Sequence, residues 1–228
     1  MANTYLSKTI TPSNYNKKKF TFSTWFKTDG ITASGEIFGF FGANDYTTLR
    51  TNNSNKIDFI VYDGSTIVRK ISNALLRDVN GWYHIVLAVD SDNSTAEDRV
   101  KIYLNGERIT SFSTSTNASS GFEFINNNKT NFTIGKNNDQ NGDAFYFGGS
   151  MSHFHFCESQ QYDATPFGEY DANGVWKIIL EPSVTYGTNG FFILKDGNSV
   201  TDQSGNSNNW TVGGGTLTNT EDCPSNVF

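Results

Sequence analysis

The amino-acid sequence predicts an all-β fold in which two antiparallel sheets pack as a sandwich. The chain holds 19 Phe and 10 Tyr, and 21 Gly against only 4 Pro, a composition that favours short strands joined by tight turns. Bulky and small residues alternate with a period near two in several segments, whereas no window of about eleven residues keeps the 3.6-residue period of a helix. Because 228 residues bury one substantial core, we expect a single domain over residues 1–228.

The clearest strand signal lies in residues 20–26, where Phe and Trp alternate with Thr and Ser up to the turn signal Asp29-Gly30. Asn105-Gly106 separates two strand-like runs, residues 101–104 and 107–110, and predicts a tight hairpin because both residues tolerate positive φ. Further strands, each bounded by Gly, Asn or Ser, are expected at residues 36–42, 56–62, 66–72, 82–90, 99–104, 131–136, 151–157 and 190–195.

Other segments lack a strand signal. Residues 72–77 and 163–167 are compatible with a short helical turn at most. Residues 111–120 and 213–220 are rich in Ser, Thr, Asn and Gly, and we expect them to be loops.

The charge distribution argues against nucleic acid as a partner. The formal net charge is −6, and the only basic run, residues 17–19, precedes a strand and is expected to be a solvated strand entry. No apolar run is long enough for a membrane span, and no signal peptide precedes the first strand. Cys157 and Cys223 form no CxxC pair and are expected to be free thiols, with a disulfide only if assembly occurs outside a reducing cell.

Several fragments occur in an order that resembles the laminin G-like branch of the concanavalin A-like superfamily. They are residues 22–27, 81–86, 102–106, 133–135, 147–151 and 154–156. The resemblance spans most of residues 20–157 and implies a two-sheet antiparallel jelly-roll sandwich. Residues 1–19 are then an N-terminal arm.

The end of the chain resembles the opening of many laminin G-like modules. The similar stretches are residues 189–195 and 202–206, so the resemblance implies a circularly permuted sandwich. Residues 158–228 would form a C-terminal extension in which residues 190–212 insert as strands that complete the sandwich. A separate flap is the alternative, disfavoured because Phe191, Phe192 and Ile193 are too apolar to leave exposed.

A narrower resemblance is to lectin-like virion proteins of marine bacteriophages. It is carried by residues 167–169, 174–177, 186–191 and 202–211. It implies a virion surface protein, on a tail fibre or as a capsid decoration, made in the host cytoplasm. Its expected partners are other virion structural proteins, further copies of itself, and a host or particle-surface polysaccharide. The alternative is a structural assembly or decoration protein that binds no sugar.

No catalytic pattern is found in the sequence, and we expect no enzyme. A Glu-x-Asp-x-Glu pair of carboxylates is absent, as is a Gly-x-Ser-x-Gly elbow. His153, His155 and Cys157 alternate along one predicted strand and could present three soft ligands to zinc. Successive side chains on one strand face lie about 6.5 to 7 Å apart, which is too far to share one ion, so zinc is disfavoured.

Calcium is the one cofactor that the sequence suggests. Residues 137–143 alternate short side chains that carry oxygen, with Asp139, Asn141 and Asp143 as candidate ligands. Laminin G-like modules often hold calcium at one rim, so the resemblance adds to this expectation. The same residue types also make ordinary surface turns, and the EF-hand pattern is absent.

Carbohydrate binding requires an exposed aromatic ring beside groups that hydrogen-bond to hydroxyls. The candidates are Tyr46 beside Asp45, Tyr62 beside Asp63, and Tyr146. Each of the three rings could equally belong to the core or to an interface.

Overall fold

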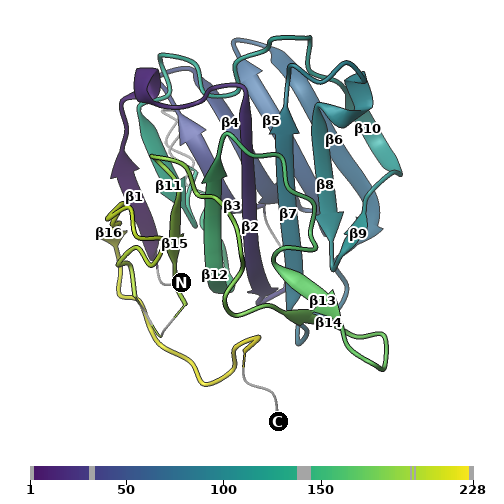
Figure 1. Cartoon of the computed structure of the whole chain (residues 1–228), viewed down its shortest axis with the longest axis vertical. Helices are drawn as coiled ribbons and strands as arrows, with labels where there is room; N and C mark the ends of the chain where they lie inside the picture. The colour runs from purple at the N-terminus through teal and green to yellow at the C-terminus, as the bar shows by residue number, and fades with distance from the viewer. Residues whose placement is uncertain (1–2, 31–33, 138–144, 196, 198, 226–228) are drawn as a thin grey trace.

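The computed structural model of the protein describes residues 3–30, 34–137, 145–195, 197 and 199–225. Two antiparallel sheets lie face to face (Figure 1). The larger sheet runs in the order β10 (Phe112–Thr116), β6 (Thr66–Leu75), β5 (Lys56–Asp63), β4 (Asp45–Thr51), β3 (Gly35–Phe41), β11 (Asn131–Ile134), β1 (Tyr5–Thr9), β16 (Thr211–Gly214). The smaller sheet runs in the order β15 (Phe191–Ile193), β12 (Gly149–Glu158), β2 (Lys19–Thr28), β7 (Tyr83–Asp90), β8 (Val100–Leu104), β9 (Glu107–Arg108). The predicted fold class is confirmed.

Phenylalanine rings fill the space between the sheets. Phe22 on β2 stacks on Phe38 on β3 with ring centroids 3.9 Å apart, and Phe20 contacts Phe40 at 5.9 Å. All four side chains are completely buried. Burial of each stabilises the fold by about 1.5 to 3 kcal/mol, so the aromatic alternation seen in the sequence is what joins the two layers.

The last part of the chain adds a strand to each sheet. β15 pairs with β12, and β16 pairs with β1. Trp210, just before β16, packs in the core with its ring 5.0 Å from Phe191 and 4.9 Å from Phe132. Residues 5–9, which we expected to lie in an N-terminal arm, form β1 between β11 and β16. Both chain ends therefore lie at the same end of the sandwich (Figure 1).

The outer face of the six-stranded sheet is covered by residues 162–186. This segment includes a two-stranded hairpin of β13 (Gly168–Tyr170) and β14 (Trp176–Ile178). Phe167 and Ala164 of the segment pack with Val86 of β7 and Cys157 of β12 in a second apolar cluster. Cys157 is buried and Cys223 half-buried, and both are free thiols.

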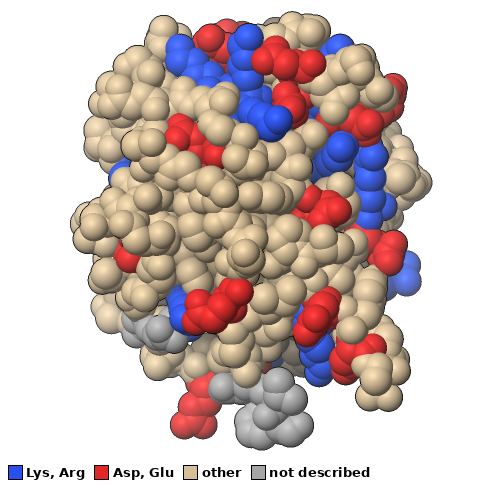
Figure 2. All heavy atoms as spheres, in the orientation of Figure 1, with Lys and Arg blue, Asp and Glu red and all other residues tan. Residues whose placement is uncertain are grey.

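The basic run at the start of β2 is neutralised locally. Lys17, Lys18 and Lys19 pair with Glu123, Asp92 and Asp90 respectively. Figure 2 shows blue and red side chains mixed along the upper end of this face, while the middle of the face carries few charges. The run is a solvated strand entry, as the sequence predicts.

The predicted hairpin is confirmed, because Asn105 (φ 49°) and Gly106 (φ 87°) turn the chain from β8 to β9. The loop expected at residues 111–120 is partly wrong, since β10 forms there as an edge strand. Lys70 Nζ on β6 donates to Ser115 Oγ at 2.7 Å, so side-chain polar contacts support this strand in place of apolar alternation. The loop expected at residues 213–220 is likewise partly wrong, because β16 extends to Gly214.

The short helical turn considered for residues 72–77 does not form, because β6 continues to Leu75. Within the residues given above, the helical segments are two 3-10 turns, Pro12–Asn14 and Ala96–Asp98. None of them is long or apolar enough to cross a membrane.

Candidate functional site

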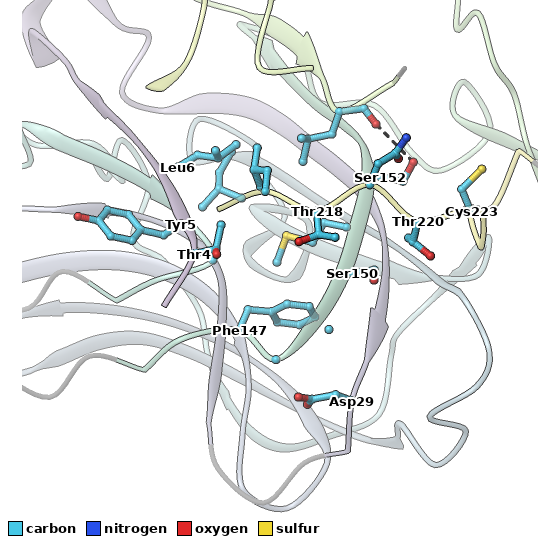
Figure 3. Close-up of a pocket in the computed structure, with 18 of the residues that line it drawn as sticks. Thr4, Tyr5, Leu6, Asp29, Phe147, Ser150, Ser152, Thr218, Thr220 and Cys223 are labelled. Atoms are coloured by element: carbon cyan, nitrogen blue, oxygen red, sulfur yellow. Dashed lines mark hydrogen bonds between the residues drawn. The ribbon is translucent and has the colours of Figure 1, made fainter. Parts of the chain in front are cut away.

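A cavity of about 500 Å³ opens at the end of the sandwich where the two chain termini lie. Figure 3 shows its walls, which come from the start of β1, the start of β12 with the residues before it, and the C-terminal tail. The tail is defined here as residues 216–223. The lining residues used below are Thr4, Tyr5, Asp29, Trp82, Tyr146, Phe147, Ser150, Thr218, Thr220 and Asp222.

Two glycines shape the floor of the pocket where β12 meets β2. Gly149 has φ +138°, and a Cβ at this position would lie 2.0 Å from the carbonyl oxygen of Lys27. A Cβ on Gly148 would lie 2.4 Å from a carboxylate oxygen of Asp29. A side chain at position 149 would clash with the backbone of β2, so glycine is required there, whereas a side chain at position 148 would displace the Asp29 carboxylate.

An aromatic pair lies along one side of the pocket. The rings of Tyr5 and Tyr146 have centroids 6.2 Å apart and are tilted by 55°. Lys136, which forms a β-bridge with Tyr146, places Nζ 4.5 Å from the Tyr5 centroid. A cation over a ring face is attracted to it, so Lys136 helps to fix the rings that border the cavity. Tyr5 and Tyr146 are each half-buried.

The tail is held in place by one carboxylate. Trp82 Nε1 donates to Asp222 at 2.9 Å, and Lys27 Nζ donates to the other oxygen of the same carboxylate. These hydrogen bonds, that from Lys27 foremost, hold the pKa of Asp222 below its usual range. Thr4 Oγ1 also donates to the carbonyl oxygen of Thr216 at 3.1 Å. The tail thus forms a wall of the pocket although it contributes little to the core.

The polar groups that face the cavity are mostly hydroxyls. Ser150, Thr218 and Thr220 line it, and Asp29 lies at its lower edge in Figure 3. Asp29 is exposed, and its carboxylate makes no hydrogen bond or ion pair with the residues that the structure describes. The pocket therefore offers both donors and acceptors next to aromatic surface.

The five predicted carbohydrate contacts divide between two places. Tyr146 lines the pocket. Tyr46 and Tyr62 are cross-strand partners on β4 and β5, and their rings stack with centroids 5.2 Å apart and planes 15° apart. The sheet register links Tyr46 to Phe41, Phe41 to Asn131, and Asn131 to Thr9. Thr9 and Tyr5 are at opposite ends of β1, so the tyrosine pair lies at the opposite end of the sheet from the pocket.

Asp45 and Asp63 are cross-strand partners beside the tyrosine pair. Asp45 is buried and is held by Asn126 Nδ2 and by Lys129 Nζ, 3.6 Å away, whereas Asp63 is exposed. Asp45 thus has a structural role in anchoring the segment before β11. The candidate calcium ligands Asp139, Asn141 and Asp143 lie outside the described residues.

A polar row crosses the outer face of the eight-stranded sheet. Glu36 on β3 pairs in register with Arg50 on β4, which pairs with Asp58 on β5. Arg50 and Arg69 both donate to the Asp58 carboxylate, which is completely buried. Glu36 is also completely buried, and burial raises its pKa well above the usual value. The sequence analysis did not identify any residue of this row.

The predicted zinc candidates are buried under residues 162–186. His155 stacks on Phe192 at 4.0 Å, its Nδ1 lies 3.0 Å from the Tyr186 hydroxyl, and burial lowers its pKa. Burial raises the pKa of the Cys157 thiol, which disfavours the thiolate that zinc requires. In the described part of the chain, no three His, Cys, Asp or Glu side chains are placed to hold a metal ion.

A buried Ser23-His84 pair has the wrong polarity for nucleophilic catalysis. Trp176 Nε1, which can only donate, lies 3.0 Å from His84 Nδ1, so Nδ1 accepts. Neutral His84 then carries its proton on Nε2 and donates it to Ser23 Oγ at 2.9 Å. Burial lowers the pKa of His84 to about 3. The pair therefore attaches the hairpin of β13 and β14 to the sheet and does not activate Ser23.

The sequence analysis missed Tyr5, Trp82 and Asp222. Tyr5 lay in a segment expected to be an arm, and Asp222 lies 140 residues from its partner Trp82. Trp82 carried a signal of its own, since it stands in the 81–86 fragment, yet that fragment indicated a strand and not a site.

The model of the concanavalin A-like lectin/glucanase superfamily matches residues 3–160 of the chain. A comparison with curated proteins gives no match. A solved protein of Bacteroides ovatus, whose suggested function is carbohydrate binding, is 18% identical with a TM-score of 0.60. The match covers 97% of this chain and 59% of that one. The K499G mutant of NanB sialidase from Streptococcus pneumoniae is 17% identical with a TM-score of 0.50, over 72% of this chain and 27% of that one. These likenesses show the shared fold.

Proposed function

The chain belongs to the concanavalin A-like lectin/glucanase superfamily, and on that premise we propose that it is a lectin-like module that binds carbohydrate in the pocket at the end of the sandwich. The observation that carries the proposal is the pocket itself. Its volume of about 500 Å³ falls in the range of about 300 to 1,000 Å³ that small-molecule sites occupy.

The chemistry of the walls fits a saccharide. The C–H face of a sugar ring packs on an aromatic side chain such as Tyr146, while its hydroxyls need partners that donate and accept. Ser150, Thr218 and Thr220 supply such hydroxyls, and the Asp29 carboxylate accepts from sugar hydroxyls. The suggested carbohydrate binding of the Bacteroides ovatus protein, of whose length this chain spans 59%, is in line with the proposal.

We propose binding without catalysis. The superfamily also contains glucanases, which place two carboxylates on either side of the scissile bond. In the pocket, Asp222 is engaged by Lys27 and Trp82, so Asp29 is the carboxylate left to meet a ligand. One carboxylate orients a hydroxyl and does not provide the pair that this mechanism needs.

We further propose that the module is displayed on the surface of a bacteriophage particle, on a tail fibre or as a capsid decoration. The support is the resemblance of residues 167–211 to lectin-like virion proteins. Virion structural proteins and further copies of the chain would then be its partners, and a host or particle-surface polysaccharide its ligand. Repeated display converts weak single-site binding into avidity. A decoration protein that binds no sugar remains the alternative, and the titration below separates the two.

The pocket is tested by binding to immobilised and soluble neutral oligosaccharides. A glycan array selects the best ligand, and isothermal titration calorimetry then compares the native chain with two pocket variants. Tyr146→Ala removes a ring and should weaken binding about tenfold, which corresponds to about 1.4 kcal/mol. Ser150→Trp should abolish binding because the indole fills the cavity. Tyr170→Ala, at an exposed tyrosine on β13, is the matched control and should leave the affinity unchanged.

Thermal denaturation of each variant shows that it is folded. The proposal fails if no neutral saccharide binds at millimolar concentration, or if Ser150→Trp binds as tightly as the native chain. The same titration in EDTA and with added Ca²⁺ tests the calcium proposal for Asp139, Asn141 and Asp143. Weaker binding in EDTA supports it, and equal affinity in both buffers contradicts it without affecting the pocket.

A further inference from the structure

An aromatic ladder and a cationic row share the outer face of the eight-stranded sheet, away from the pocket. Tyr46 and Arg50 lie four positions apart on β4, and Tyr62 and Asp58 lie four positions apart on β5, so all four side chains project from the same face. Arg69 of β6 joins the row through Asp58. Aromatic surface and charged groups thus occur on one face of the sheet, about 13 Å apart along the strands.

The row carries an excess of positive charge. Arg50 donates from Nε and Nη2 to one oxygen of Asp58, both at 3.1 Å, and Arg69 donates from Nε and Nη2 at 3.2 and 3.0 Å. A single carboxylate therefore serves two guanidinium groups. The Nη1 group of each arginine makes no hydrogen bond with any residue that the structure describes, so donors are left over in a chain whose net charge is −6.

Glu36 does not balance the second arginine, because its carboxyl is not favoured in the ionised form. Its carboxyl is completely buried next to Arg50, and neither oxygen has a hydrogen-bond partner among the described residues. Burial is the main cause that raises its pKa, with Arg50 opposing it, so the neutral acid is favoured. A buried polar group without a partner costs about 1 to 3 kcal/mol. Glu36 therefore leaves the positive charge of the two arginines largely uncompensated.

Arg69 in the row and Tyr62 in the ladder are the members best placed to meet a ligand. The Arg69 side chain is 32% exposed and that of Arg50 is 16% exposed. Tyr46 lies between Phe41 at 6.2 Å and Tyr62 at 5.2 Å, so both of its ring faces are covered. Tyr62 ends the ladder, and its neighbour in register on β6 is Thr66, a small exposed residue. One face of the Tyr62 ring is therefore left for a sugar ring.

We propose that this face is a second carbohydrate site, selective for acidic saccharides, in which Arg69 and Arg50 bind the anionic group and Tyr62 packs against the ring. A planar guanidinium with free N–H groups suits a carboxylate of a uronic acid. The inference rests on the proposed carbohydrate binding but uses residues that are all distinct from the pocket. Each site therefore provides the control for the other.

The test titrates the full chain with an oligogalacturonate and with a neutral oligosaccharide of equal length. Arg69→Gln should weaken oligogalacturonate binding at least tenfold and leave neutral binding unchanged, and Asp58 keeps Arg50 as its partner in this variant. Tyr62→Ala is a second variant with the same expected selectivity. Ser150→Trp should leave oligogalacturonate binding intact. A sulfated oligosaccharide distinguishes a carboxylate-specific site from one that accepts any anion.

The outcomes separate the two proposals. Unchanged oligogalacturonate binding in both Arg69→Gln and Tyr62→Ala overturns the second site. If Arg69→Gln abolishes acidic binding while no neutral saccharide enters the pocket, the second site stands and the pocket proposal falls. Acidic binding that disappears only in Ser150→Trp places both ligands in the pocket and contradicts the second site.

Discussion

At the scale of single residues, the buried charges on the large sheet differ sharply in how they are satisfied. Asp58 accepts hydrogen bonds from two arginines. Glu36, on the other side of Arg50 from Asp58, accepts none from the described residues. Desolvation without compensation makes the ionised form of a buried carboxyl unfavourable. Glu36 therefore lowers stability at neutral pH, and the sign of its effect follows from its raised pKa.

Replacing Glu36 by Gln should stabilise the protein increasingly as pH rises. The unfolded chain ionises Glu36 near its usual pKa, whereas the folded chain retains the proton to higher pH. The unfolded state thus gains relative stability as pH rises between these two values, by at most about 1.4 kcal/mol per pH unit. Urea denaturation of the native chain and of Glu36→Gln at pH 4.5, 6 and 7.5 measures the difference in their free energies of unfolding. If the stability advantage of Glu36→Gln over the native chain decreases as pH rises, Glu36 is ionised and stabilising in the fold.

The sequence could indicate some candidate site residues but not their grouping. Aromatic residues next to or shortly after an acid were selected, namely Tyr46, Tyr62 and Tyr146, and two of these do meet in a stack. Tyr146 lies at the pocket beside Tyr5 because it forms a β-bridge with Lys136, just after β11. Local composition contains no information about which distant residues an aromatic ring will contact in the folded chain.

At the scale of elements, alternation predicted the strands that have one apolar face. Residues 20–26 lie within β2, and residues 56–62 within β5. β4, with the sequence DYTTLRT, was missed because Thr47 and Thr48 fill positions where an apolar residue would signal a strand. Thr47 Oγ1 donates to the Phe124 carbonyl oxygen and Thr48 Oγ1 to that of Phe38, so hydrogen bonds replace apolar contacts in burying this strand.

β15 should be essential to the stability of the sandwich although it is short and late in the chain. Phe191 is almost completely buried, and its ring lies 5.0 Å from Trp210 and 5.7 Å from Phe132. Phe191→Ala should destabilise the fold by about 3 to 5 kcal/mol through loss of contacts and cavity formation. Val212→Ala on β16, where the side chain is 38% exposed, is the matched control and should cost less than about 1 kcal/mol.

Denaturation midpoints of the two variants provide the comparison. Equal small losses in both would mean that residues 190–212 only rest on a sandwich that is complete without them.

At the scale of the whole molecule, the proposed binding site is built from segments that lie far apart in the chain. The pocket joins residues 4–6, 147–152 and 216–223, and Asp222 spans 195 residues to reach Lys27. These segments meet only when both sheets have formed, so a pattern search along the sequence could not have found the site. The fold class was predictable because it depends on periodicity, which each strand carries separately.

The two proposed sites lie on different surfaces of one sandwich. The pocket opens where the termini meet, and the arginine row lies on the outer face of β3 to β6. The opposite outer face, that of the small sheet, is covered by residues 162–186. A chain displayed in many copies would therefore present both sites away from the covered face, and avidity would strengthen weak contacts.

The four tryptophans allow the central claim to be tested directly. Trp82 lines the pocket, whereas Trp25 and Trp176 stack on His84 and Trp210 lies in the core. The measurement is ¹⁹F NMR of protein labelled with 5-fluorotryptophan during titration with the best neutral saccharide, and Trp82→Phe assigns the resonance. We predict a saturable shift of the Trp82 signal while the other three stay in place. A saturable shift confined to Trp25 or Trp176, or no shift at all at millimolar saccharide, would contradict a carbohydrate site in the pocket.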